Sequence, residues 1–390
     1  MKSWTLDKFT TAVIDKQYIV IDSETTLINK DKSIYSEIPT FILGVRYLAD
    51  SSIYTHYTTI SSYSSVVFGA PVPIVVGHNL AYDLLQTRAR YEHFPRNFVY
   101  WDTAIAAYEM SGQTRTFPSL EESAEAYGIK ATKDSAVSEM IKGGICPKDI
   151  PQNMLLDYCK QDVILTNLLF EKQFSHFIRL PRNLQNLILE RMDYRINTHL
   201  MSMNGMYMDK LEMTSEIEVL NEKALHLNDL LTATMSYHLP EIPVLEINPS
   251  STKQLENVLY GGTYSVKKDI LTGEVYKTGP KAGTPKTRKE IIACEVVSPL
   301  YPCKATTLGT GGWTTKEEDL KKLSPKSAFV DSLLEYRGIM KELNTYFIGY
   351  LDAGYTYDRY NVINTEFKHT ITPTGRISST KPNIQNLTGD

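Results

Sequence analysis

The sequence has few cysteines, no long apolar run and no large excess of charge of one sign. Four of the 390 residues are cysteine, and none lies in a C-x-x-C pair or in a Cys/His cluster with zinc spacing. These counts exclude a disulfide-stapled scaffold and favour reduced thiols. The most apolar stretch, residues 66–77, contains two prolines and is shorter than the roughly 20 residues of a membrane span. We therefore expect a cytoplasmic protein with no membrane partner.

The remaining composition is that of a globular protein. Lys and Arg number 41 against 45 Asp and Glu, so the formal net charge of −4 excludes a uniformly basic coat protein but not local basic surfaces. Hydrophobic residues make up 42% and charged residues 22%. A chain of this length predicts two or three domains.

The first 180 residues alternate strand-like and helix-like patterns. This alternation predicts an α/β fold with a mixed sheet and helices on its faces. The strands are expected at 18–21, 40–47, 52–59 and 73–76, and the helices at 80–91, 102–110, 120–127 and 154–174.

From about residue 181 the pattern becomes mainly helical. Long amphipathic helices are expected at 184–203, 210–235 and 327–351, with Ser327 as N-cap of the last. Between them, residues 261–289 are rich in Gly, Thr, Pro and Lys and predict a basic loop or hairpin. A solvated charged face is at least as good an interpretation of this loop as a DNA contact.

Two acids follow the first predicted strand, in the sequence VIDSET at residues 20–25. Residues two apart on a strand share a face, so Asp22 and Glu24 would point together. Like charges this close repel each other unless a cation lies between them. Taken alone, the segment also fits a turn with two solvated acids.

Two further patterns place polar residues at helical spacing. In GHNLAYD, residues 77–83, Asn79 and Asp83 are four apart and share a face, although Asn79 also stands at an expected helix N-cap. In YCKQD, residues 158–162, Tyr158 and Asp162 have the same spacing, which a surface tyrosine beside a surface acid would also give.

Together the three patterns predict a metal-dependent phosphodiesterase site. Four carboxylates from one strand and two helices can converge on two divalent cations, and hard oxygen ligands suit Mg²⁺ or Mn²⁺. Two such ions activate a water and stabilise the departing 3′ oxygen. A nearby tyrosine can hold the attacking water, but a phenol with its ordinary pKa of about 10 is a poor base.

The three motifs, in this order, resemble the DEDD 3′–5′ proofreading exonucleases in the variant with a tyrosine in the third motif. The resemblance implies a ribonuclease H-like sheet and two-metal hydrolysis of DNA 3′ ends. It implies that Asp22, Glu24 and Asp162 ligate the tighter metal, and that Asp22 bridges to a second metal near Asp83. Tyr158 then belongs to the catalytic set and Asn79 to the DNA contacts. The segment at residues 101–103 matches an element that we interpret as structural.

A second resemblance lies in TPTGRISSTKPNIQN, residues 372–386. Its hydroxyls, Gly-Arg pair and amides suit nucleic-acid contact, although composition alone predicts a polar loop. The string resembles the T-x-T-G-R-[IL]-S-S-x-x-P-N-[IL]-Q-N segment at the start of the palm in family A DNA polymerases. The resemblance implies that Arg376 reaches the duplex near the primer terminus and that Gln385 and Asn386 lie close to the template–primer.

Upstream segments at 204–209, 247–255 and 334–346 also resemble elements of that family. We therefore expect an exonuclease domain at 1–180, a helical thumb-like region at 181–365 and the start of a polymerase palm, incomplete here, at 366–390. In the basic loop at 261–289, the candidate DNA contacts are Lys281, Lys286 and Arg288.

The palm aspartates and fingers helix of the family find no counterpart in this sequence, so we expect no primer extension by the chain alone. One hypothesis is a split polymerase, in which a second polypeptide supplies the rest of the palm and the fingers. The other is a truncated product with exonuclease activity only. The sequence of these segments is phage-like rather than bacterial, which would place the protein in the host cytoplasm.

The sequence therefore predicts a 3′–5′ proofreading DNA exonuclease that acts on single-stranded 3′ ends and primer–template duplex. Two alternatives stay open at this point. One is a non-catalytic DNA-binding clamp with a decayed site, against which the intact motifs argue. The other is a nuclease that trims RNA ends, because the same superfamily processes RNA.

Overall fold

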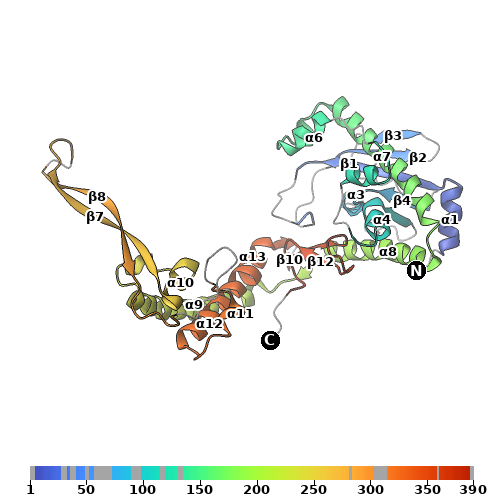
Figure 1. Cartoon of the computed structure of the whole chain (residues 1–390). Coiled ribbons are helices and arrows are strands. Elements are labelled where there is room, and N and C mark those ends of the chain that lie inside the picture. Colours follow the sequence, from blue (N-terminus) through green and yellow to red (C-terminus); the bar gives the residue numbers. More distant parts are fainter. Residues whose placement is uncertain are drawn as a thin grey trace. The chain divides into compact units, whose positions relative to one another are not determined.

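The computed structural model describes residues 5–27, 33–35, 41–48, 52–56, 73–88, 98–114, 119–130, 135–280, 283–302, 314–357 and 360–386. The chain forms two compact units (Figure 1). The first joins Met1–Met208 with Tyr350–Asp390, and the second is Asp209–Gly349. The division at 180 and 365 expected from the sequence stays a prediction, and the candidate contact Lys281 lies outside the described residues.

A five-stranded mixed sheet forms the centre of the first unit. Strand β1 pairs antiparallel with β2 and parallel with β4, in the order β3-β2-β1-β4-β5. The middle position of β1 follows from its apolar residues 18–21, which are buried. The strands are β1 Tyr18–Thr25, β2 Phe41–Leu48, β3 Ile53–His56, β4 Ile74–Gly77 and β5 Val99–Asp102. The predicted mixed α/β sheet is confirmed.

Seven helices in the described part of residues 1–208 surround or extend from the sheet. They are α1 Leu6–Ile14, α3 Ala81–Arg88, α4 Thr103–Met110, α5 Leu120–Ala126, α6 Ser135–Lys142, α7 Gln152–Phe177 and α8 Arg182–Asn204, with a short 3₁₀ turn at Pro147–Asp149. Helix α7 presents Val163, Phe170 and Phe177, spaced by seven residues and fully buried, to the core. Phe9 of α1 stacks on Trp101 of β5 with ring centroids 5.4 Å apart, so α1 closes the same core.

The first unit continues after residue 349 with short strands. Strand β10 (Tyr360–Ile363) lies between β6 (Met206–Tyr207) and β9 (Tyr355–Tyr357), and β11 (Glu366–Lys368) pairs with β12 (Ser378–Thr380). Gly205 ends α8 with φ +66°, and a Cβ there would approach Val362 Cγ1 to 2.5 Å. Only glycine has both the left-handed freedom and the small size that this junction needs.

The second unit is mainly helical, as predicted. Leu231, Leu255 and Leu333 are fully buried in its core, and the Ser327 hydroxyl caps α12 by accepting a hydrogen bond from the Phe329 amide at 3.3 Å. The helices are α9 Lys210–His238, α10 Thr252–Tyr260, α11 Glu317–Leu320 and α12 Ala328–Glu342, with a 3₁₀ turn at Val244–Glu246. A π-helical stretch, Leu343–Ile348, leads into α13, Gly349–Ala353.

The basic segment of the second unit forms a long antiparallel hairpin of β7 (Thr263–Val275) and β8 (Pro285–Glu295), drawn in Figure 1 as a two-stranded ribbon. Two of its candidate DNA contacts have acidic partners. Lys286 Nζ lies 3.0 Å from Glu274 Oε2, and Arg288 pairs with Glu290. The DNA-contact role of these two residues stays a prediction.

In the part of the chain that the structure describes, no helix has the length and apolar character needed to cross a membrane.

Candidate active site

Strand β1 directs Asp22 and Glu24 to the same side. Both are half-buried, whereas the intervening Ser23 and the following Thr25 are buried, which is the alternation expected of a strand. The sulfur of Cys159 in α7, a residue that the motif spacing does not reveal, completes a group with these two acids. One ligand atom from each of the three residues lies within 4.8 Å of the others.

Asp83 joins the same group from the first turn of α3. Its side chain is 3% exposed, and its Oδ1 accepts a hydrogen bond from Ser23 Oγ at 2.7 Å. Burial raises the pKa of Asp83 well above its usual value, and the nearby Asp22 carboxylate raises it further. The second motif therefore lies against the first.

Helix α7 brings the third motif to this point. Asp162 is buried and Tyr158, one turn earlier, is half-buried. Burial raises the pKa of the Cys159 thiol, and the carboxylates that raise it further are those of Asp22, Glu24 and Asp162. The thiol thus keeps its proton and donates a hydrogen bond to Asp22 Oδ2 at 3.1 Å.

The donor set fits a divalent cation. Burial and then repulsion by the Asp22 carboxylate raise the pKa of Asp83, and the carboxylates of Glu24 and Asp162 lie near the Cys159 thiol that contacts Asp22. Bound positive charge would relieve that repulsion. The hard carboxylate oxygens match Mg²⁺ or Mn²⁺, whereas a protonated thiol is no ligand for such an ion.

Asn79 does not cap α3, so the expected N-cap is wrong. The helix begins at Ala81, and Asn79 has a left-handed φ of +53°. The backbone N–H of Asn79 donates to Asp102 Oδ1 at 3.1 Å, and the side-chain Oδ1 of Asn79 accepts from Arg195 Nη2 at 3.3 Å. A contact with residues distant in sequence therefore replaces the local capping bond.

Asp102 fixes the start of two helices at once. It is 3% exposed and accepts three backbone N–H groups, from Asn79 at 3.1 Å, Leu80 at 3.0 Å and Ala104 at 3.0 Å. The last bond caps α4, and the other two hold the segment that leads into α3 and Asp83. This contact network supports the structural interpretation of residues 101–103.

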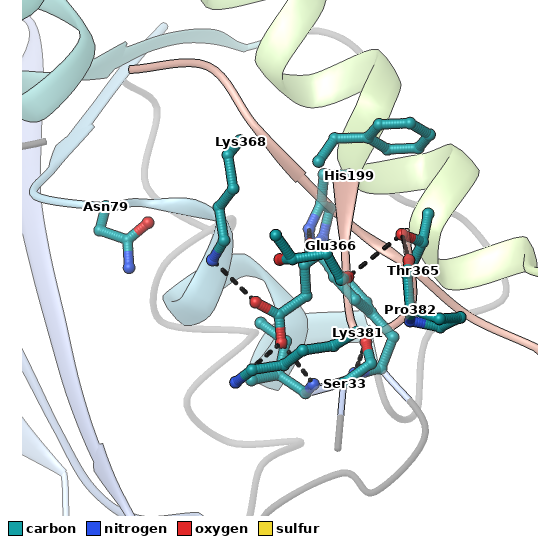
Figure 2. Close-up of polar contacts among 12 residues, drawn as sticks. Ser33, Asn79, His199, Thr365, Glu366, Lys368, Lys381 and Pro382 are labelled. Atoms are coloured by element: carbon teal, nitrogen blue, oxygen red, sulfur yellow. Dashed lines mark hydrogen bonds and ion pairs between the residues drawn. The ribbon is translucent and has the colours of Figure 1, made fainter. Parts of the chain in front are cut away.

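A cavity of about 260 Å³ lies beside this network. Asn79, Arg195 and Lys368 are among its lining residues, and Asn79 and Lys368 are both drawn in Figure 2. Figure 2 also shows the buried Glu366 carboxylate between Lys368 Nζ, 2.7 Å away, and Lys381 Nζ, 3.8 Å away. The segment that resembles a polymerase palm is thus anchored within the first unit.

Three candidate DNA contacts of that segment have exposed side chains. They are Arg376, Gln385 and Asn386. Backbone contacts shape the segment around them, since the Arg376 carbonyl accepts from the Thr372 hydroxyl and the Gln385 amide donates to Asn383 Oδ1 at 3.1 Å. Their role toward DNA stays a prediction.

Comparison with known proteins now identifies the relationship. Residues 2–173 match the family model for 3′-5′ exonucleases, and residues 284–389 match that for DNA polymerase family A. These two segments of the chain are similar to 3′-5′ exonucleases and to family A DNA polymerases. The resemblance read from the motifs is confirmed, as is the α/β fold with an exonuclease domain of ribonuclease H-like type and a helical region.

Individual relatives agree with these matches. DNA polymerase I of Bacillus subtilis is 41% identical over 76 residues, 20% of this chain and 8% of that protein. DNA polymerase I of Caldicellulosiruptor bescii is 30% identical over 175 residues, 43% of this chain and 20% of that protein. The solved structure described as the POL domain of Pol1 from M. smegmatis in complex with DNA primer-template and dNTP superposes with a TM-score of 0.61 at 19% identity. That superposition covers 99% of this chain and 55% of the M. smegmatis chain, so the chain spans only part of the proteins it matches.

Proposed function

We propose that this protein removes nucleotides from the 3′ end of DNA by metal-dependent hydrolysis, as the proofreading part of a family A polymerase. The observation that carries the proposal is the convergence of three separate motifs on Asp22. Asp83 acts on it electrostatically, Cys159 donates to it, and Glu24 and Asp162 lie close enough to act on the same thiol.

Asp22, Glu24, Asp83 and Asp162 would hold two divalent cations. Cations in such a site supply an activated water and stabilise the departing 3′ oxygen. The chain's own contribution is to keep the carboxylates in position. Ser23 holds Asp83 at 2.7 Å, the Cys159 thiol holds Asp22 at 3.1 Å, and Asp102 fixes the entry to α3.

Tyr158 is proposed to orient the attacking water by a hydrogen bond from its hydroxyl. It stands one turn before Asp162 on α7 and is half-buried, so its ring is packed while part of it remains accessible. A hydroxyl that only orients a water keeps its own proton, so Tyr158 does not need the pKa near the working pH that a general base requires.

The DNA partner is proposed from two supports. The M. smegmatis structure is described as a complex with primer-template, and residues 284–389 match the polymerase family. We propose that Asn79, Arg376, Gln385 and Asn386 contact DNA in the first unit, and that the hairpin with Lys286 and Arg288 contacts it in the second. Completion of the polymerase by a second polypeptide stays a prediction, and co-purification from the native source would test it.

The experiment follows the fate of a labelled strand. The purified chain is incubated with 5′-labelled single-stranded DNA, primer–template or RNA of the same sequence, with Mg²⁺ or with EDTA. Stepwise shortening of DNA from the 3′ end, abolished in EDTA and not reversed by the four dNTPs, is expected.

Each alternative gives a different pattern. Faster shortening of RNA than of DNA would replace the proposal with the RNA-trimming hypothesis. Binding of DNA without cleavage in Mg²⁺ or Mn²⁺ would replace it with the clamp hypothesis. Primer extension by the chain alone would contradict the expected lack of polymerase activity.

A further inference from the structure

Arg195 of α8 lies outside all three carboxylate motifs, yet it contacts one of them. Its Nη2 donates to Asn79 Oδ1 at 3.3 Å, and its Nη1 donates to the Phe367 carbonyl at 3.1 Å. Both bonds lie within the first compact unit, and Arg195 and Asn79 are each half-buried. One guanidinium therefore links the second exonuclease motif to strand β11.

These contacts fix which way the Asn79 amide faces. A guanidinium has only donors, so the atom that meets it must be the amide oxygen and not the nitrogen. The Asn79 backbone is held as well, since its N–H donates to Asp102 and its carbonyl accepts from the Tyr82 amide at 3.0 Å. Within the described residues, Nδ2 is the polar atom of Asn79 for which the structure shows no partner.

The orientation has a chemical consequence at the cavity beside Asn79. With Oδ1 turned to Arg195, the amide offers two N–H donors elsewhere, and DNA presents acceptors at its phosphates and base edges. Without Arg195, the amide could rotate by half a turn and present its oxygen, which an anionic phosphate would repel. The left-handed backbone of Asn79 limits other ways of aiming the side chain.

We propose that Arg195 is a positioning residue for DNA recognition: it locks the Asn79 amide with its donors free for the substrate strand. Because the same guanidinium also binds the Phe367 carbonyl, the orientation of Asn79 depends on how β11 is seated. This inference rests on the proposed nuclease function. It adds a residue that the motif spacing alone does not reveal.

The test is a double-mutant cycle on the full chain, with cleavage of a 5′-labelled single strand in Mg²⁺ as readout. Arg195→Met and Asn79→Ala are each expected to raise KM about tenfold with kcat changed less than twofold, because each weakens the contact between Asn79 and the substrate, which is common to ground and transition states. A tenfold change corresponds to about 1.4 kcal/mol. The double variant is expected to match Asn79→Ala alone, because Arg195 acts through Asn79.

Arg182→Met is the matched control. Arg182 lies on the same helix and forms an exposed ion pair with Asp7 at 3.0 Å, so its removal should leave KM unchanged. Arg195→Lys should recover only part of the affinity, since one ammonium cannot reproduce the two aligned bonds of the guanidinium. A wild-type KM for Arg195→Lys would show that charge alone matters and would overturn the proposal, as would additive effects in the double variant.

Asn79→Asp keeps the test decisive if Arg195→Met fails to fold. Aspartate retains the acceptor for Arg195 and removes the free donors, so KM should rise at least as much as with Asn79→Ala, whereas an unchanged KM would refute the proposal. Should the wild-type chain bind DNA without cleaving it, the proposed function fails separately. The same variants are then compared by their Kd for the strand in EDTA, with the same expected tenfold weakening and the same non-additivity.

Discussion

At the scale of single residues, two buried acids of the same region have opposite tasks. Asp102 accepts hydrogen bonds from the backbone N–H groups of three residues, which gives it a structural role. Burial and then the nearby Asp22 carboxylate raise the pKa of Asp83, which suits a group that is completed by a cation. Sequence spacing found Asp83 but could not distinguish these roles, because the donors around Asp102 come from residues up to 23 positions away.

Removing Asp102 should therefore unfold the site locally and cost stability. Asp102→Ala leaves three buried N–H groups without their acceptor and should lower the free energy of unfolding by about 3 kcal/mol, whereas Asp102→Asn, which keeps one acceptor oxygen, should cost less. Urea titration measures both. Asp7→Asn, which breaks only an exposed ion pair with Arg182, should change stability by less than about 0.5 kcal/mol. Equal destabilisation by Asp102→Ala and Asp7→Asn would contradict the network.

His369 gives the protein a pH dependence that can be isolated. Burial lowers its pKa to about 3, with the nearby Arg195 and Arg191 charges contributing, so the imidazole is neutral in the folded chain. An unfolded histidine titrates near pH 6.5, and the unfolded state therefore binds more protons between these values. Stability consequently falls as the pH drops below about 6.5, by about 2 kcal/mol at pH 5.

His369→Gln removes this titration. It should lower the free energy of unfolding at pH 7.5, because Thr198 loses its 2.7 Å partner. At pH 5 the difference in free energy of unfolding between the wild type and the variant should be smaller by about 2 kcal/mol. Urea titrations of both proteins at the two pH values provide the comparison. If the difference in free energy of unfolding is the same at both pH values, His369 keeps its ordinary pKa in the folded chain.

At the scale of elements, local pattern and distant contact each decide part of the fold. Strand β1 and helices α7, α8, α9 and α12 were expected near their observed positions because their apolar spacing is regular. Helix α1 and strand β5 were not expected. Each is short, and they are joined by the Phe9–Trp101 stack, which unites residues 92 positions apart. The start of α3 at Ala81 lies within one residue of the expected start, but the N-cap role of Asn79 was not predicted correctly, because its backbone N–H donates to the distant Asp102.

The hairpin allows an element-scale prediction about DNA. Neutralising Lys281, Lys286 and Arg288 to Gln should weaken DNA binding and reduce its salt dependence by about one unit of slope for each phosphate that is no longer neutralised. Fluorescence anisotropy over a salt series measures this slope. The control is Lys321, Lys322 and Lys326, exposed lysines of the same unit, changed to Gln for the same charge difference. Identical slopes for the two triple variants would place the hairpin away from DNA.

At the scale of the whole molecule, the first compact unit combines segments that match families of different activity. Residues 2–173 match exonucleases and residues 284–389 match polymerases, yet residues 350–390 pack with the exonuclease segment. Motif spacing predicted the carboxylates because each motif is local. It could not predict Cys159, Ser23 or Arg195 as their supports, because those contacts arise only when β1, α7 and α8 pack together.

Asp22 is the point where the three motifs meet. The most direct measurement is the rate at which the purified chain shortens a 5′-labelled strand in Mg²⁺, compared between the wild type, Asp22→Ala and Asp162→Ala. We predict 3′-end shortening by the wild type. Both variants should be inactive, because each loses a carboxylate that would hold a metal. In EDTA both should be at least as stable to unfolding as the wild type, because each substitution removes crowded negative charge. Cleavage by Asp22→Ala at the wild-type rate would contradict the assignment of this site.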